Sequence, residues 1–150
     1  MITKLRPGST DLALGVIFLL VSVIAPFFEE SHRQFWTFAP LVFAVPLLCS
    51  ATLLLLIRSR AAIVTARVVH YLLLVICAHL ILLSALWLLN PYMWGAAFLT
   101  PWPTLLVTAN SLGTLQWTAQ SKGERIRGCL VPVVASIVAL PMILAGYLAW

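Results

Sequence analysis

The stretch from residue 68 to residue 121 contains no Asp, Glu, Lys or Arg, and this long uncharged run constrains the fold more than any other feature. As one helix it would be about 80 Å long at 1.5 Å per residue, whereas the hydrocarbon core of a bilayer is about 30 Å thick. Residues 90–95 (NPYMWG) interrupt the run with a proline and a glycine, which favour a turn. The run therefore predicts two helices joined by a turn.

Composition extends this conclusion to the whole chain of 150 residues. Hydrophobic residues make up 63% and charged residues 9%, whereas soluble domains carry about 25% charged residues. Because so few charges cannot cover a water-facing surface, the sequence predicts an integral membrane protein. The net charge of +5 does not indicate nucleic-acid binding, since the basic residues lie in short clusters between apolar runs, as in loops that face anionic lipid. Membrane lipid is the expected partner.

A helix that crosses a bilayer needs about 20 predominantly apolar residues. Five stretches approach this requirement: residues 10–28, 35–57, 68–89, 96–117 and 128–150. The predicted fold is an all-α bundle of five transmembrane helices that forms a single domain. The first stretch resembles a signal peptide, but it is longer than the usual apolar region of about 7–15 residues and lacks a small-x-small cleavage pattern. It is expected to be a retained span.

Two basic clusters flank the uncharged run and predict the topology. They consist of Arg58, Arg60 and Arg67 before it, and Lys122, Arg125 and Arg127 after it. Basic residues are enriched in cytoplasmic loops, so an even number of spans should separate the clusters. Five spans with the N-terminus in the cytoplasm and the C-terminus outside leave only Arg33 of the nine basic residues outside. The alternative has four spans and a re-entrant segment at residues 96–117. The expected location is a bacterial inner membrane.

The predicted fourth helix is polar for a membrane span, and its hydroxyl residues gather on one side. At 100° per residue, an arc of about 120° contains Thr100, Thr104, Thr108, Ser111 and Thr114. Small polar residues favour close helix packing in lipid. Thr104, Thr108 and Ser111 are therefore expected to pack against neighbouring helices. The alternative is that this hydroxyl stripe lines a hydrated path.

The two histidines of the third predicted helix, His70 and His79, lie nine residues apart and so on opposite faces. Because they cannot share a haem or a metal ion, we expect no cofactor and no metal. His79 lies near the middle of the predicted span, where a polar side chain is costly. It is expected to be buried and hydrogen-bonded, whereas His70 is expected to reach lipid headgroups or a carbonyl near the cytoplasmic end.

The four acidic residues, Asp11, Glu29, Glu30 and Glu124, are all assigned to positions outside the span interiors. Coupled transport and metal-dependent phosphoryl transfer generally need such groups along the path or in the site. Glu29 and Glu30 form a small group with His32, which is interpreted as part of a solvated loop. The sequence also contains no nucleophile elbow and no Gly-rich phosphate loop. No catalytic residue, enzymatic activity or soluble substrate is therefore predicted.

The predicted fifth helix carries Ala135 and Ala139, a small-xxx-small pair that would let another helix approach closely. The predicted function is that of a non-catalytic membrane protein that acts through helix contacts or self-association. It would be an accessory or assembly subunit of a membrane complex, or an immunity protein against a membrane-targeting toxin. The alternative is a small oligomeric channel or carrier whose path is lined by the hydroxyl stripe. The sequence carries no family signature that we recognise.

Overall fold

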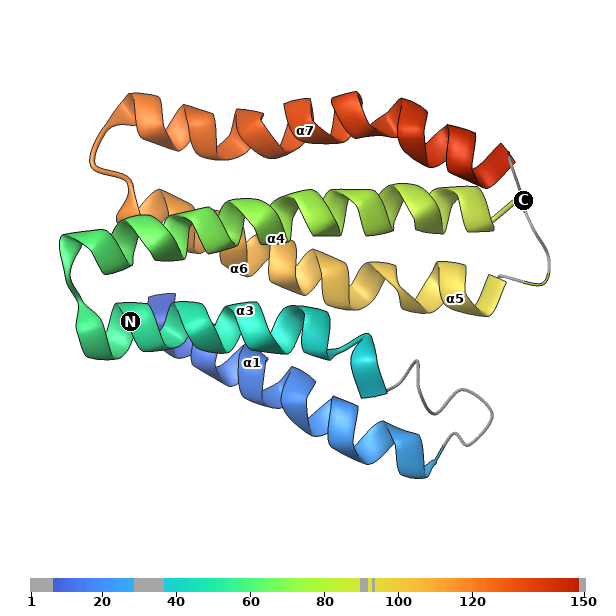
Figure 1. Cartoon of the computed structure of the whole chain (residues 1–150), viewed down its shortest axis with the longest axis horizontal. Coiled ribbons are helices and arrows are strands. Elements are labelled where there is room, and N and C mark those ends of the chain that lie inside the picture. The colour runs from blue at the N-terminus through green and yellow to red at the C-terminus, as the bar shows by residue number, and fades with distance from the viewer. Residues whose placement is uncertain (1–6, 29–36, 90–91, 93, 149–150) are drawn as a thin grey trace, which may run out of the picture. The chain divides into compact units, whose positions relative to one another are not determined.

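The computed structural model describes residues 7–28, 37–89, 92 and 94–148 (Figure 1). Within these ranges all regular secondary structure is helical and no strand occurs, so the all-α prediction is confirmed for this part of the chain. Two compact units divide the chain, residues 1–69 and residues 70–150. The boundary falls inside a long helix, and each unit is described by itself.

The first unit contains two main helical segments before residue 58. α1 (Pro7–Ile24) continues into the 3₁₀ turn η1 (Ala25–Phe27). α3 (Leu41–Thr52) starts at the carbonyl of Pro40 and continues into the π-helical turn η2 (Leu53–Ile57). Arg58 ends this segment with a left-handed backbone at φ 51°. The second helix was predicted over residues 35–57; residues 35 and 36 lie outside the described residues, and the continuous helix begins only at Leu41.

α1 and α3 lie side by side and run antiparallel (Figure 1). Neighbouring pairs follow opposite directions along the two helices: Gly8 with Leu55, Asp11 with Ser50, Gly15 with Leu48, and Phe18 with Phe43. The α1 members recur every three or four residues, which places them on one face of the helix. The glycines let the helices approach closely at two levels, and the rings of Phe18 and Phe43, 5.3 Å apart, fill a third.

α4 (Arg60–Trp87) begins well before the predicted residue 68, so the prediction of a loop over residues 58–67 is wrong. The hydroxyl of Ser59 accepts a hydrogen bond from the Ala62 N–H at 3.1 Å, which is the N-cap interaction that starts helices. Alanine-rich sequence follows, and alanine has the highest helix propensity. Arginine residues are compatible with a helix, so Arg60 and Arg67 lie in the first turns of α4, and Arg58 precedes it.

The second unit contains the rest of α4 together with α5 (Trp94–Leu99), α6 (Pro101–Thr118) and α7 (Lys122–Leu148). The predicted helix over residues 96–117 is helical except at Thr100, which separates α5 from α6. α7 begins at Lys122 instead of the predicted residue 128. Ser121 accepts a hydrogen bond from the Glu124 N–H, and the Glu124 carboxylate accepts one from the Gln120 N–H. This reciprocal capping fixes the start of α7.

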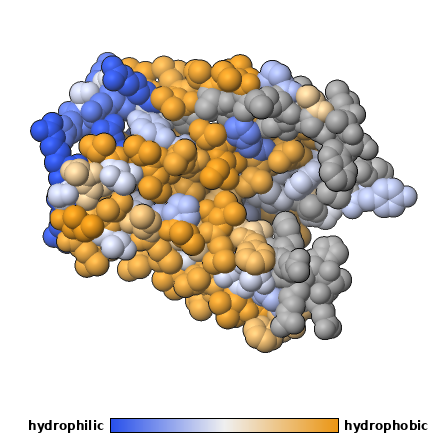
Figure 2. Space-filling model, viewed as in Figure 1, coloured by the Kyte–Doolittle hydropathy of each residue, from blue (hydrophilic) through white to orange (hydrophobic). Residues whose placement is uncertain are grey.

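Two helices of the described residues are long and apolar enough to cross a bilayer. They are Gly8–Phe27, with a mean hydropathy of 2.2, and Arg60–Trp87, with a mean hydropathy of 2.3. The apolar helix Leu41–Ile57 is shorter, about 25 Å at 1.5 Å per residue. In Figure 2 apolar residues cover most of the visible helix surface, and hydrophilic residues gather where α7 begins. These features are compatible with a location in a membrane.

Candidate helix-contact sites

α6 has two faces of different chemistry. The buried face consists of Thr104, Val107, Ser111, Thr114, Leu115 and Thr118. The opposite face is exposed and consists of Trp102, Leu105, Leu106, Ala109, Gly113, Gln116 and Trp117. At 100° per residue the two sets occupy separate arcs of the helix. The hydroxyl stripe therefore lies on the packed side of α6, with Thr108 half-buried at its margin.

Three threonines of α6 direct their hydroxyl groups to their own helix. Thr104 donates to the carbonyl oxygens of Thr100 and Pro101 at 3.0 and 2.7 Å. Thr108 donates to the Thr104 carbonyl at 2.7 Å, and Thr118 donates to the Thr114 carbonyl at 2.8 Å. These bonds satisfy hydroxyl groups that would otherwise be costly to bury.

Thr114 differs from these residues. Its side chain is 1% exposed, and its hydroxyl has no hydrogen-bond partner within the part of the chain that the structure describes. Buried hydroxyl groups are normally paired, often with an ordered water molecule. Thr114 thus carries a buried hydroxyl that no described group of the protein satisfies.

Two side-chain contacts join α4 to α6. The Nδ1 atom of His70 lies 3.0 Å from the hydroxyl oxygen of Ser111, and both residues are fully buried. Further along α4, the side chain of Cys77 lies close to that of Thr108. Because the later α4 residue meets the earlier α6 residue, the two helices run antiparallel. Thr108 and Ser111 of the predicted set therefore contact α4 directly.

The roles predicted for the two histidines are corrected by the structure. His70 was expected to reach headgroups or a carbonyl, but it is buried and pairs with Ser111. His79 is only half-buried, and its Nδ1–H donates to the Val75 carbonyl of its own helix at 2.6 Å. His70 lies four residues after Ala66 and three before Leu73, and both of these residues are buried. This helical spacing places His70 on the packed face of α4.

The first unit contains a buried carboxylate that the sequence analysis placed at the edge of a span. Asp11 is 0% exposed, and its Oδ2 atom accepts a hydrogen bond from the Ser50 hydroxyl at 2.7 Å. Asp11 lies in the first turn of the apolar helix Gly8–Phe27, near the end of a candidate span as expected, but its burial is not predicted from the sequence. Asp11 follows Gly8 by three residues and precedes Gly15 by four. This helical spacing places all three residues on the packed face of α1.

Replacing Ser50 with alanine is expected to lower the free energy of unfolding by about 1–3 kcal/mol, because a buried carboxylate loses a hydrogen-bond donor. Ser22→Ala is the matched control: Ser22 is also buried, but its hydroxyl donates only to the Leu19 carbonyl of its own helix. Its loss should cost less than about 1 kcal/mol. Equilibrium unfolding of the two variants provides the measurement, and equal losses would contradict a special role for the contact between Asp11 and Ser50.

Ala135 and Ala139 lie in α7, but their side chains are outside the described residues. The same holds for Glu29, Glu30 and His32. Among the described residues no group of three or more His, Cys, Asp or Glu side chains is placed to hold a metal ion.

The described fold defines an all-helical protein in which two helices are able to span a membrane and polar side chains link adjacent helices. Comparison of the chain with protein-family models, curated proteins and solved structures finds no match. The function must therefore be argued from the helix surfaces themselves.

Proposed function

We propose that the chain is a non-catalytic multi-pass membrane protein that binds a helix of another membrane protein, as an accessory or assembly subunit of a complex. The observation that carries this proposal is the exposed face of α6. Ala109 and Gly113 lie there one turn apart, and a Cβ atom added at Gly113 would meet nothing within 4 Å. Such small-xxx-small pairs let a second helix approach closely in lipid.

The polarity of α6 supports coverage of this face by protein. α6 is not among the described helices that are apolar enough to cross a membrane unaided, and its exposed face includes the amide side chain of Gln116. An amide in contact with lipid tails loses hydrogen bonds, whereas a partner helix can supply them. The exposed indole rings of Trp102 and Trp117 lie near the two ends of the same face. A partner helix would lie between them.

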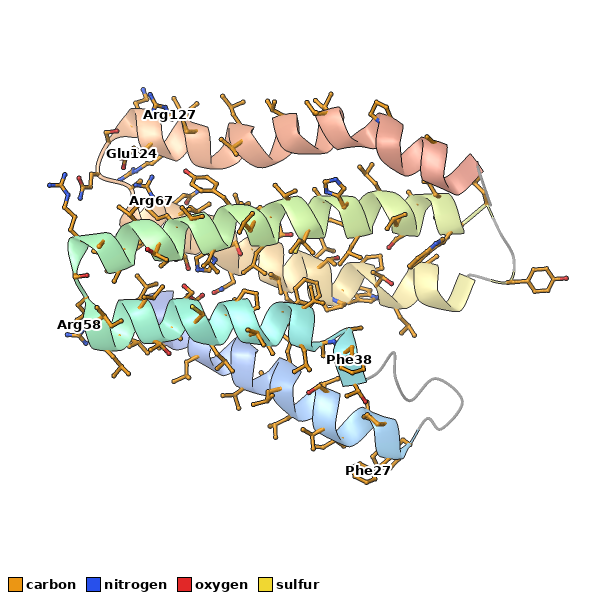
Figure 3. The ribbon with its side chains drawn as sticks, viewed as in Figure 1. Phe27, Phe38, Arg58, Arg67, Glu124 and Arg127 are labelled. Atoms are coloured by element: carbon orange, nitrogen blue, oxygen red, sulfur yellow. The ribbon has the colours of Figure 1, made fainter. Side chains whose placement is uncertain are left out.

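The proposed topology has five spans, with the N-terminus in the cytoplasm of a bacterial cell and the C-terminus outside. The antiparallel contacts of α4 and α6 favour a full return crossing over a re-entrant segment. The Tyr71 hydroxyl lies 4.0 Å from the position of a Cβ at Gly128, so α4 and α7 are neighbours at these residues. In the first unit, Figure 3 shows Arg58 at one end of the hairpin and Phe27 and Phe38 at the other. Basic cytoplasmic ends and aromatic outer ends fit this orientation.

Reporter fusions test the topology. A reporter fused after residue 120 should be active in the cytoplasm, and one fused after residue 148 should be active outside, because α7 is expected to cross between them. A cytoplasmic signal from both fusions would contradict the five-span arrangement, and an outside signal after residue 120 would favour the re-entrant alternative.

The partner site is tested by Gly113→Leu. The leucine side chain should prevent close approach and reduce co-purification of the partner in mild detergent by about tenfold or more, as expected for a loss of at least 1.4 kcal/mol. Gly95→Leu is the matched control, since Gly95 is an exposed helical glycine that is equally open. Mass spectrometry identifies proteins retained by the wild type and by Gly95→Leu but lost from Gly113→Leu. Equal retention by all three would reject this face as the binding site. For the immunity version, the same variant should lose protection against the toxin.

A channel or carrier is the second candidate, and two observations favour it. Asp11 is a buried carboxylate inside an apolar helix, and the buried Thr114 hydroxyl has no partner among the described residues. Polar groups at membrane depth often mark ion or substrate paths. Proteoliposomes that contain only this protein would then show solute flux, and Asp11→Asn would abolish it. The local hydrogen bonds of Thr104, Thr108 and Thr118 favour packing instead.

A further inference from the structure

α7 exposes a continuous apolar surface that the proposed partner site does not use. Among the described residues of α7 only Gly128 is buried. The exposed apolar side chains are Ile126, Leu130, Val131, Val133, Val134, Ile137 and Val138. At 100° per residue, those of residues 126, 130, 133, 134 and 137 occupy an arc of about 100°. We call these five residues the α7 ridge.

Two cations flank the beginning of the α7 ridge. On the same helical projection, Lys122 and Arg127 lie on opposite sides of Ile126 and Leu130, and both are exposed. Arg125 adds a third exposed positive charge in the same turns. The nearby Glu124 carboxylate accepts the Gln120 N–H in the helix cap. Figure 3 shows Arg127 and Glu124 at the beginning of α7. This end of the helix therefore favours an anionic group.

The length of the α7 ridge matches one leaflet of a bilayer. From Ile126 to Ile137 the helix rises about 16 Å at 1.5 Å per residue, and half of the hydrocarbon core is about 15 Å. The cations lie at the beginning of the ridge, where a phosphate group would lie if the ridge contacted acyl chains. A ligand that fits both parts has an anionic head and an apolar tail about one leaflet long.

The composition of the α7 ridge distinguishes lipid from a partner helix. Helix interfaces in membranes are enriched in Gly, Ala, Ser and Thr, which let backbones approach. The ridge contains only valine, isoleucine and leucine, in contrast to the Ala109 and Gly113 face of α6. Bulky branched side chains hold a second helix away but leave grooves for flexible acyl chains.

We infer that α7 binds an anionic phospholipid of the cytoplasmic leaflet, with its phosphate between Lys122 and Arg127 and an acyl chain along the α7 ridge. The site rests on the proposed membrane location of the chain. It adds a lipid ligand of defined charge to the proposed function and assigns that ligand to a helix face separate from the partner site.

Native mass spectrometry of the full chain in detergent tests the site. Phosphatidylglycerol and phosphatidylcholine of the same chain length are added, and the bound fractions are compared. The wild type should bind phosphatidylglycerol about tenfold more tightly, and the Lys122→Gln/Arg127→Gln double variant should lose that preference. Arg58→Gln/Arg60→Gln is the matched control, since it removes two exposed charges elsewhere. It should keep the preference.

Several outcomes would overturn the site. Equal loss in both double variants would mean that net charge alone attracts the lipid. Displacement of phosphatidylglycerol by millimolar inorganic phosphate would mean that the head is bound without the chain, and equal affinity for both lipids would remove the anionic requirement. Each of these results leaves the membrane location intact if the chain is still extracted only by detergent. Recovery of the chain in the aqueous fraction without detergent would reject the proposed function as well.

Discussion

Gly15→Leu is expected to separate α1 from α3 and to lower the free energy of unfolding by about 3 kcal/mol, at the upper end of the usual cost of overpacking. Even the Cβ atom of a new residue would lie 2.8 Å from Leu48 Cγ and 3.2 Å from the Leu48 backbone nitrogen. The side chain could rotate away, but the backbone nitrogen cannot move without moving α3. The helices must therefore shift apart, which also lengthens the hydrogen bond between Ser50 and Asp11. Equilibrium unfolding followed by circular dichroism measures the loss.

Gly113→Leu is the control, because it introduces the same side chain in a helix where nothing lies within 4 Å. Its stability should equal or slightly exceed that of the wild type, since a glycine inside a helix costs about 1 kcal/mol relative to alanine. The two variants should thus have opposite phenotypes: Gly15→Leu destabilises the fold, and Gly113→Leu loses the partner. A Gly15→Leu protein of wild-type stability would disprove the close contact of α1 with α3.

The second large effect is expected from replacing Thr104, Thr108 and Ser111 together with leucine. Thr104 and Ser111 are 0% exposed, so larger side chains would overpack the buried face of α6. His70 would also lose its Ser111 partner. We expect the free energy of unfolding to fall by more than about 3 kcal/mol, because overpacking and a lost buried hydrogen bond act at one interface. The fold should fail before any effect on partner binding can be measured.

The matched control places three leucines on the opposite face of α6, at Ala109, Gly113 and Gln116. These positions are exposed, so stability should be retained while the partner is lost. Unfolding curves and pull-down of both triple variants provide the comparison. If the buried triple variant kept its stability but lost solute flux in proteoliposomes, the hydroxyl stripe would line a path, and the channel alternative would be favoured.

The sequence predicts the helical class and the packed side of α6, because periodicity reports which residues share a face. It misplaces the start of α4 because a cluster of charged residues between apolar runs predicts a loop. A charge limits how deeply a residue can be buried, but it does not end a helix. Ser59 caps the helix, and the basic side chains then project from its first turns. In residues 58–67 the presence of charged residues therefore does not indicate whether the backbone is helical.

The two histidines show a second limit. Position along a predicted span indicated His79 as the buried residue, but burial also depends on which side of the helix meets a neighbour. His70 faces Ser111, and His79 bonds to its own backbone. Asp11 was misjudged for the same reason. The exposed small-residue face of α6 was missed because Ala109 and Gly113 become informative only once the opposite face is known to be packed.

The contact between Asp11 and Ser50 also has a consequence for biosynthesis. The two residues are separated by 39 positions, and the ribosome adds about 5–20 residues per second, so the carboxylate exists for roughly 2–8 s before its hydroxyl donor is made. During that interval α1 carries an acidic group that lipid tails would not solvate. In the proposed membrane location, release of α1 into lipid is therefore favoured only after α3 has been synthesised. The hairpin would then enter the bilayer as a pair.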